Sequence, residues 1–286
     1  MYQVLNKQLL APGLIRIDVS APDVAAKAQP GQFVIVRVCE DGERIPLTIG
    51  GADAKTGAVT LLVQMVGLST TLMGETPVGG EFASVTGPLG NPTHFGDAKR
   101  VLCIGGGVGT AVLYPQVSYL SSKGIYVDVI EGTRNKDLLV LEDEFTKLAN
   151  HLYVATNDGS KGVKGFVTDV FAKLMEQGEH YDLVIAIGPP IMMKVVAEAT
   201  RPYGIRTLVS LNPIMVDGTG MCGGCRVNVG GQTKFVCVDG PEFDGLQVDF
   251  DGMMKRLGCF KPQERRMMDH ACHLMNEAEQ RELAKK

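Results

Sequence analysis

The sequence predicts an antiparallel β-barrel over residues 1–96, followed by a doubly wound α/β domain over residues 97–213. Two observations support this. Short apolar or alternating segments separated by glycine and proline turns fill the first part, which is typical of β-strands. After residue 97, nearly all-apolar segments alternate with helical patterns, which indicates a buried parallel sheet. A cysteine-bearing segment over 214–250 and a polar tail over 251–286 that we expect to be helical complete the chain.

The expected barrel strands lie between turn sequences such as Ala11–Pro12–Gly13. No long helical pattern interrupts them. Several strands at this spacing favour a small antiparallel barrel or sandwich. The strands are expected at 14–20, 32–38, 58–66 and 81–87.

In the second part, the strand–helix alternation requires right-handed crossovers and therefore a doubly wound sheet. The expected strands are 100–106, 125–132, 152–159, 182–190 and 206–210. The expected helices are 109–122, 137–150, 165–178 and 190–204.

Composition excludes several classes of function. The net charge of −4 provides no basic field for nucleic acid or an anionic membrane. The chain has no apolar run long enough to span a bilayer, and its first residues lack the pattern of a signal peptide. Seven cysteines without a secretory signal indicate a reducing compartment, where paired cysteines are more often ligands than disulfides. We therefore expect a cytoplasmic protein.

A glycine run stands between an expected strand and an expected helix. Backbone N–H groups at a helix N-terminus bind phosphate oxygens, and a missing Cβ lets a pyrophosphate approach. The spacing departs from G-x-G-x-x-G because Thr110 occupies the third position, so a tight turn without a ligand remains an alternative. The nucleotide-binding candidates are Gly105, Gly106, Gly107 and Gly109.

Glu131 ends the next expected strand. A carboxylate there can accept hydrogen bonds from an adenosine ribose and would repel a 2′-phosphate, which predicts NADH over NADPH. The alternative is a solvated strand end, and Arg134 nearby weakens the preference for NADH.

Together these parts resemble the ferredoxin–NADP reductase superfamily, and four local motifs carry the resemblance. "QPGQF" at 29–33 is similar to the entry into a barrel strand, and "RIPLTI" at 44–49 to the flavin motif R-x-x-[ST], here in the shifted form R-x-P-x-[ST]. "VGLSTTLM" at 66–73 resembles the pyrophosphate loop, and "AIGPP" at 186–190 the signature at the nicotinamide end. Ile187 stands where many members carry cysteine.

The resemblance implies an FAD site on the barrel. Arg44 would pair with the FAD pyrophosphate and Thr48 would lie near the flavin ring. Taken singly, an arginine in a barrel strand is usually solvated and a Gly-Leu-Ser-Thr turn is usually only a turn. The implied cofactor residues are Arg44, Pro46, Leu47, Thr48, Gly67, Ser69, Thr70, Gly188 and Pro189.

The cysteine segment reads D-x₄-C-x₂-C-x₁₁-C, with Asp217, Cys222, Cys225 and Cys237 as candidate metal ligands. Plant-type [2Fe–2S] spacing has cysteine in the first position, which Asp217 occupies here. Structural zinc is an alternative, with ligands drawn from the tail. A second alternative is that Asp217 caps a turn and Cys259 is the fourth ligand.

This segment, placed after a flavin- and NAD-binding chain, resembles dihydroorotate dehydrogenase electron-transfer subunits. With aspartate in the first position it is more similar to the small subunits of NADH-dependent ferredoxin:NADP oxidoreductases. The resemblance implies electron transfer between NAD(H), FAD and a [2Fe–2S] cluster. A larger flavin and iron–sulfur subunit would complete a heterodimer that exchanges electrons with ferredoxin and NADP(H) by bifurcation.

No acid–base catalytic residue is required, because the cofactors supply the chemistry. One alternative is service to dihydroorotate dehydrogenase. The other, from a different class, is a protein that senses nucleotide or redox state. The tail is a possible partner contact.

Overall fold

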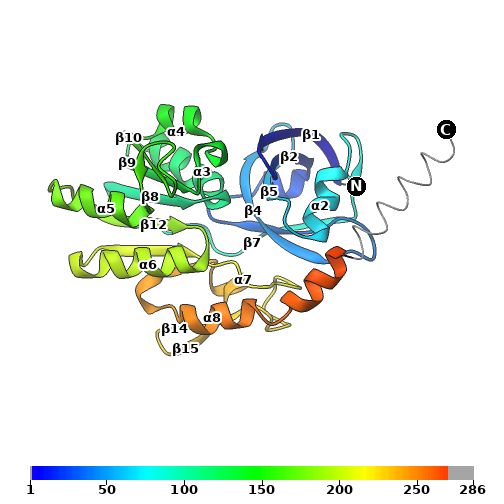
Figure 1. The fold of residues 1–286 in the computed structure, drawn as a ribbon. Helices are drawn as coiled ribbons and strands as arrows, with labels where there is room; N and C mark the ends of the chain where they lie inside the picture. The colour runs from blue at the N-terminus through cyan, green and yellow to red at the C-terminus, as the bar shows by residue number, and fades with distance from the viewer. Residues whose placement is uncertain (1, 270–286) are drawn as a thin grey trace.

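The computed structural model describes residues 2–269, and its first part is an antiparallel barrel (Figure 1). The seven strands follow the order β6-β1-β2-β5-β4-β3-β7. β6 and β7 are consecutive in the chain yet lie at opposite ends of this order, so the sheet curls into a nearly closed barrel. Its elements are β1 (Tyr2–Ala11), β2 (Leu14–Ser20), α1 (Pro22–Ala25), β3 (Phe33–Arg37), β4 (Arg44–Asp53), β5 (Ala58–Gln64), α2 (Leu68–Glu75), β6 (Glu81–Phe82) and β7 (Ser84–Leu89).

The barrel is confirmed, but the expected strands include neither β4 nor β1. This strand pairs with β2 with register shifts between Val4 and Asn6 and between Leu9 and Ala11. Such irregularities change which side chains face the core. The simple alternation that identifies a strand in a sequence is therefore interrupted in β1.

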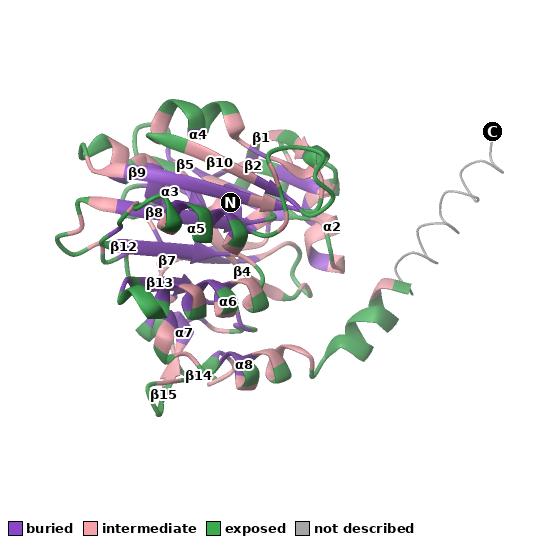
Figure 2. Cartoon of the chain, turned by 60° about the vertical axis from the view of Figure 1, so that its left-hand side comes forward, coloured by how far each residue is buried: buried purple, intermediate pink, exposed green. Residues whose placement is uncertain are grey.

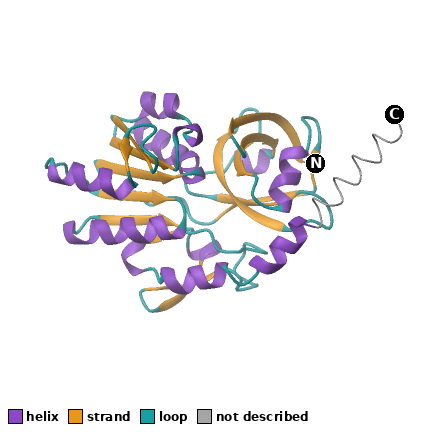
Figure 3. Ribbon diagram, in the orientation of Figure 1, coloured by secondary structure: helices purple, strands orange, loops and turns teal. Residues whose placement is uncertain are grey.

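The second part is a mostly parallel sheet with the order β11-β10-β9-β8-β12-β13-β16. Apolar side chains of α3 and α4 pack on one face, and those of α5 and α6 on the other (Figure 3). This confirms the predicted parallel sheet. The strands are β8 (Arg100–Gly106), β9 (Tyr126–Thr133), β10 (His151–Thr156), β11 (Val163–Lys164), β12 (Leu183–Ile187), β13 (Arg206–Ser210) and β16 (Glu242–Asp244). The helices are α3 (Val108–Ser122), α4 (Glu142–Leu148), α5 (Val167–Glu176) and α6 (Pro190–Thr200), with the 3₁₀ turn η2 (Arg201–Tyr203) after α6.

The helix predicted over 137–150 is wrong in its first half. A 3₁₀ turn, η1 (Lys136–Leu138), is followed by Leu141 with φ of 56° before α4 begins. The amide of Val140 donates to the buried Glu131 carboxylate at 2.8 Å, so it cannot take part in a helical ladder. The chain is drawn inward at Val140, and the helix starts after it.

The cysteine segment joins the α/β sheet. β16 pairs antiparallel with β13, so the segment extends the same sheet. Its other elements are the hairpin β14 (Arg226–Val229) and β15 (Gln232–Phe235), α7 (Val236–Asp239) and the turn η3 (Gly245–Gln247). The helix α8 (Phe250–Leu257) begins at the end of the segment and continues into the tail. In the tail, residues 251–257 and 261–269 are helical, as the sequence predicts, and residues 270–286 lie outside the described residues.

One hydrophobic core runs through all three parts. It includes Phe33 and Ile35 from the barrel, Leu211 after β13, and Cys225 and Cys237 from the cysteine segment. Figure 2 shows the buried strands between layers of partly exposed helices. The cysteine segment is therefore packed against both domains. Within residues 2–269, no helix combines the length and apolarity needed to cross a membrane.

A buried carboxylate lies where the three parts meet. Glu242, on β16, accepts hydrogen bonds from Thr93 Oγ1 at 3.1 Å and from Gln116 Nε2 at 3.2 Å. Thr93 belongs to the segment between the domains, and Gln116 lies on α3. Burial raises the pKa of Glu242 to about 7, from an ordinary value of 4.5. The carboxyl group is therefore partly protonated near neutral pH.

Glu242→Gln should change how stability depends on pH. A folded-state pKa above the unfolded one means that stability is greatest below about pH 4.5 and falls as the pH rises to about 7, by about 1–3 kcal/mol, with no further loss above. The variant should lack this loss in urea unfolding at about pH 5 and about pH 8. Glu176→Gln, at an exposed site on α5, serves as the control. An equal loss of stability in Glu242→Gln and wild type would contradict the assignment.

Candidate functional site

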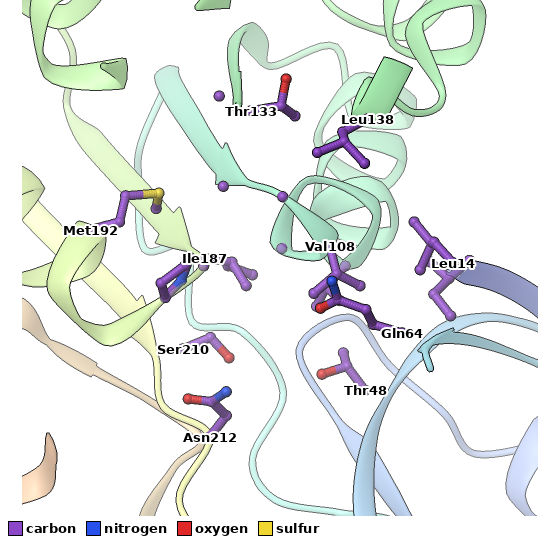
Figure 4. Close-up of a pocket in the computed structure, with 18 of the residues that line it drawn as sticks. Leu14, Thr48, Gln64, Val108, Thr133, Leu138, Ile187, Met192, Ser210 and Asn212 are labelled. Atoms are coloured by element: carbon purple, nitrogen blue, oxygen red, sulfur yellow. The ribbon is translucent and has the colours of Figure 1, made fainter. Parts of the chain in front are cut away.

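A large cavity lies between the barrel and the α/β domain (Figure 4). Its volume is about 1010 Å³, at the upper end of the ~300–1,000 Å³ typical of small-molecule sites. Thr48 and Gln64 approach from the barrel, Ser210 and Asn212 lie across from them, and Thr133 lies at the far end. An elongated ligand can therefore contact both domains.

The barrel wall of the cavity contains part of the predicted flavin motif. Pro46, Leu47 and Thr48 line it from β4, and Thr70 from α2. The Thr70 hydroxyl accepts hydrogen bonds from the amides of Val66 and Gly67 at 3.1 and 3.0 Å. This hydroxyl caps the first turn of α2 and fixes the loop in front of it.

Three other predicted flavin residues do not line the cavity in this structure. Arg44 Nε donates to the Val216 carbonyl at 2.6 Å. Ser69 Oγ donates to Glu43 Oε2 at 2.9 Å, which ties α2 to the loop before β4. Gly67 is the residue before α2, with its backbone extended.

The glycine run forms the turn from β8 into α3, where Gly106, Gly107 and Gly109 line the cavity. A Cβ on Gly109 would lie 2.2 Å from the Ile187 carbonyl oxygen, so this glycine permits α3 to pack against β12. Gly107 has φ of 57° and open space where a Cβ would project. Its backbone is therefore accessible to a phosphate at the start of α3.

Gly105 does not line the cavity. A Cβ there would lie 2.5 Å from Thr110, so its role in this structure is close packing against the first turn of α3. Thr110 stands in the third position of the glycine pattern and is fully buried. Within the glycine run, Gly105 and Gly109 therefore permit close packing, and Gly107 leaves its backbone open to a ligand.

The prediction that Glu131 binds the ribose is wrong for this structure. Glu131 is fully buried, and its Oε1 accepts the Val140 amide. Burial raises its pKa to about 8, from an ordinary value of 4.5. At the end of β9 it is Gly132 and Thr133 that line the cavity, while the Glu131 carboxylate is held in the interior by the Val140 amide. The preference for NADH therefore loses its predicted physical basis.

A positively charged side chain lies at the far end of the cavity. Among the described residues, Arg134 is the one charged side chain that lines the cavity, beside Leu138, Asn157 and Thr168. Arg134 is exposed and makes no ion pair with any described residue. An arginine in this position suits phosphate groups or the face of an adenine ring.

The opposite end of the cavity lies near the predicted nicotinamide signature. Gly188 and Pro189 line it just before α6 begins. The sequence did not single out Ser210 and Asn212, which also line the cavity: Ser210 ends β13, and Asn212 lies two residues beyond it. Ligands of open α/β sheets bind at the carboxyl ends of the strands, and that rule would have identified this pair.

The three cysteines of the candidate metal site lie in one region. The sulfur atoms of Cys225 and Cys237 are 3.3 Å apart, and both residues are buried. Cys222 is exposed, and the amide of Gly224 points to its sulfur at 3.4 Å. The Cys237 amide points to the Cys225 sulfur at 3.4 Å. Buried thiols with N–H groups directed at sulfur suit an iron–sulfur cluster.

Asp217 lies in the same loop. Its Oδ1 accepts the Thr219 amide at 2.7 Å and its Oδ2 accepts the Cys222 amide at 2.8 Å. These amides, Thr219 first, lower the pKa of Asp217. No three cysteine, histidine or acidic side chains converge as metal ligands within the described residues. Ligation by Asp217 and Cys222 therefore requires the loop to turn both side chains toward the buried pair Cys225 and Cys237.

Cys259, the alternative fourth ligand, lies beyond α8. It is exposed, and its sulfur contacts the Lys255 carbonyl at 3.6 Å. The cysteine pair, by contrast, lies in sequence between two residues that line the cavity. Met215 and Pro241, on either side of the cysteines in sequence, both line the cavity. The cysteine segment therefore contributes to the wall of the candidate flavin site.

Comparison with known proteins agrees with this geometry. The family model for the iron–sulfur cluster binding domain of dihydroorotate dehydrogenase B matches residues 212–249. The chain is 44% identical to the dihydroorotate dehydrogenase B (NAD(+)) electron transfer subunit homolog of Thermotoga maritima, with 92% of this chain and 93% of that protein covered. It is 34% identical to the electron transfer subunit of the Geobacillus sp. enzyme, with 86% and 96% covered.

A solved structure is similar over almost the whole chain. The structure of an NADH-dependent reduced ferredoxin–NADP oxidoreductase contains a chain that is 42% identical. The TM-score is 0.89, with 95% of this chain and 98% of that chain covered. The Amycolatopsis cytochrome P450 reductase, 22% identical with a TM-score of 0.59 over 70% of this chain and 65% of that chain, shares the fold.

Proposed function

The chain belongs to the family of dihydroorotate dehydrogenase B electron-transfer subunits and their homologues, and from that premise we propose that it moves electrons between NAD(H), FAD and a [2Fe–2S] cluster. It is an oxidoreductase subunit that acts with a larger partner. The observation that carries the proposal is the single cavity with walls from the barrel, the α/β domain and the cysteine segment. Thr48, Gly107 and Pro241 all line it.

The residues present fit these cofactors. Gly107 offers an open backbone position at the start of α3 for a dinucleotide phosphate, and Arg134 a positive charge at the far end. Thr48 and Thr70 line the barrel wall where FAD would lie, and Arg44 would pair with its pyrophosphate. When bound, the flavin supplies exchange between two-electron hydride transfer and single-electron transfer.

The protein's own contribution is orientation and exclusion of water. Ile187, Leu211 and Met215 line the cavity, and their apolar side chains exclude water from the place where nicotinamide and flavin would meet. Of the described residues that line this end, none is an acid or a base. This agrees with a reaction in which the cofactors, rather than side chains, carry the proton and electrons.

For the partner, we propose a larger flavin and iron–sulfur subunit in a heterodimer that exchanges electrons with ferredoxin and NADP(H) by bifurcation. The similarity to a chain of the NADH-dependent ferredoxin–NADP oxidoreductase, over 95% of this chain, supports this choice. Service to a dihydroorotate dehydrogenase is the second candidate, supported by the relatives of that name. The large subunit that copurifies distinguishes the two.

Purified protein tests the proposal directly. We expect bound FAD, iron and acid-labile sulfide in amounts near one flavin and two irons per chain, a yellow-brown colour, and reduction of an artificial dye by NADH. Colourless protein that contains zinc and does not reduce the dye would contradict the proposal. Coloured protein that binds NADH without reducing any acceptor would instead support a sensing role.

Variants at the far end of the cavity test the nucleotide site. Arg134→Ala should raise the KM for NADH in dye reduction by about tenfold or more, because a charge-assisted bond is worth about 1.5–3 kcal/mol. Glu131→Gln should leave this KM within about twofold, because Glu131 is buried away from the cavity. The opposite order of effects would show that Glu131 turns outward to bind the ribose.

Asp217 can act as a cluster ligand or as a cap of the loop, and two substitutions separate these roles. Asp217→Cys can ligate iron but cannot accept the Thr219 and Cys222 amides in the same way. Asp217→Asn keeps an acceptor for the loop but is a poor iron ligand. We expect the cysteine variant to keep the cluster with shifted EPR g-values, and the asparagine variant to lose it while FAD remains bound.

The matched control for this test is Cys259→Ser. Its thiol lies beyond α8 and should be irrelevant to the cluster, so its EPR signal should equal that of wild type. An unaltered signal in Asp217→Asn together with loss of the cluster in Asp217→Cys would assign Asp217 as a cap. Loss of the signal in Cys259→Ser would make Cys259 a ligand.

A further inference from the structure

The Arg44 side chain joins the predicted flavin motif to the cysteine segment. Its Nε donates to the carbonyl oxygen of Val216 at 2.6 Å, across 172 residues of sequence. Arg44 is the first residue of β4, and Val216 directly precedes Asp217. The barrel thus holds the backbone of the cluster loop at the position next to a candidate ligand.

The same loop rests directly on the barrel two residues further along, at Gly218. A Cβ on Gly218 would lie 2.7 Å from Leu89 Cδ1 and 2.8 Å from Ile35 Cδ1. Leu89 ends β7 and Ile35 lies in β3, so the backbone of the loop packs against two barrel strands. The φ of Gly218, 80°, also requires glycine. The hydrogen bond from Arg44 and this contact together fix residues 216–218 on the barrel.

A hydrogen bond connects the residue after Val216 to Cys222. Asp217 accepts the amides of Thr219 and Cys222, so its carboxylate sets the path of the loop up to the first candidate thiolate. A shift of the Val216 carbonyl would move Asp217, and with it the Cys222 backbone. Arg44 is therefore connected to Cys222 through one peptide unit and one carboxylate.

The guanidinium also has capacity for a flavin phosphate. Arginine carries five N–H donors in a fixed fork, and the bond to Val216 uses the one on Nε. No other hydrogen bond of the Arg44 side chain occurs among the described residues. Arg44 lies on the same face of β4 as Pro46 and Thr48, both of which line the cavity, because residues two apart in a strand share a face.

We propose that Arg44 is a positioning residue for the cluster loop as well as a ligand of FAD, so that flavin binding and cluster retention are coupled through one guanidinium. The proposal rests on the proposed function, since it requires both cofactors. Bound FAD would restrict the Arg44 side chain, which in turn would hold the Val216 carbonyl in place. A bound cluster would fix the loop that contains Val216, and this would keep Arg44 in position to bind FAD. Such coupling is reciprocal, so each cofactor strengthens binding of the other.

Iron release to a chelator tests the proposal, measured on the complete protein with FAD and after FAD has been removed. Removal of FAD from wild type should speed iron release severalfold, as coupling requires. Arg44→Ala should release iron about tenfold faster than wild type even when both lack FAD, because loss of a residue that supports ligands typically costs about 10–100-fold in metal affinity. The reduced cluster's EPR signal should broaden in the same variant.

Arg37→Ala is the matched control. Arg37 lies directly opposite Arg44 in the β3–β4 ladder and binds Glu40, not the cluster loop. This variant should release iron within about twofold of wild type. Arg44→Lys is the conservative variant, since lysine keeps the charge but cannot bind the carbonyl and a phosphate together in a fork. It should retain part of the FAD, and its iron release should no longer depend on FAD.

Failure of the proposed function and failure of the coupling through Arg44 would give different results. Wild-type protein without iron or without flavin would overturn the proposed function and this inference with it. Wild-type protein that holds both, with FAD-free Arg44→Ala releasing iron within about twofold of FAD-free wild type, would overturn the inference alone.

Discussion

The arrangement depends on one constraint, which is that the cysteine segment has no core of its own. Its buried residues, among them Cys225, Cys237 and Phe243, belong to the same hydrophobic core as Phe33 of the barrel and Val184 of the α/β sheet. Burial of apolar area is the main favourable term in folding, so the segment is stable only against both neighbours. The position of the cysteines relative to the cavity then follows from the packing of the domains.

Polar contacts make the same junction specific. The amide of Asn91 donates to the Gly240 carbonyl at 2.7 Å, and its side chain to the Val238 carbonyl at 3.1 Å. In the same segment, the Glu242 carboxyl accepts hydrogen bonds from the side chains of Thr93 and Gln116. A buried polar group such as the Glu242 carboxyl is costly when left unpaired, which disfavours other placements of the segment. The cavity wall formed by Pro241 is therefore held in one position.

The features that the sequence predicts well are local ones. Turn residues and apolar runs predict the barrel and the parallel sheet, and the spacing of Asp217 and the cysteines identifies the metal segment. Glu131 shows the limit: its place near a strand end is evident, but its carboxylate is buried against the amide of Val140, in a segment whose inward path no local pattern predicts. The pairing of β16 with β13 and the bond from Arg44 to Val216 join distant segments, so no local pattern predicts them.

The central claim is that electrons pass between NAD(H) and the cluster through the shared cavity. Anaerobic EPR in both directions tests it, with NADH added to oxidised protein and NAD⁺ added to dithionite-reduced protein. One direction must be favourable whatever the potential of the cluster. The account predicts that the reduced-cluster signal appears in the first mixture or disappears in the second, in step with a change in flavin absorbance. A cluster signal that responds to dithionite but to neither nucleotide, while the flavin responds to both, would contradict it.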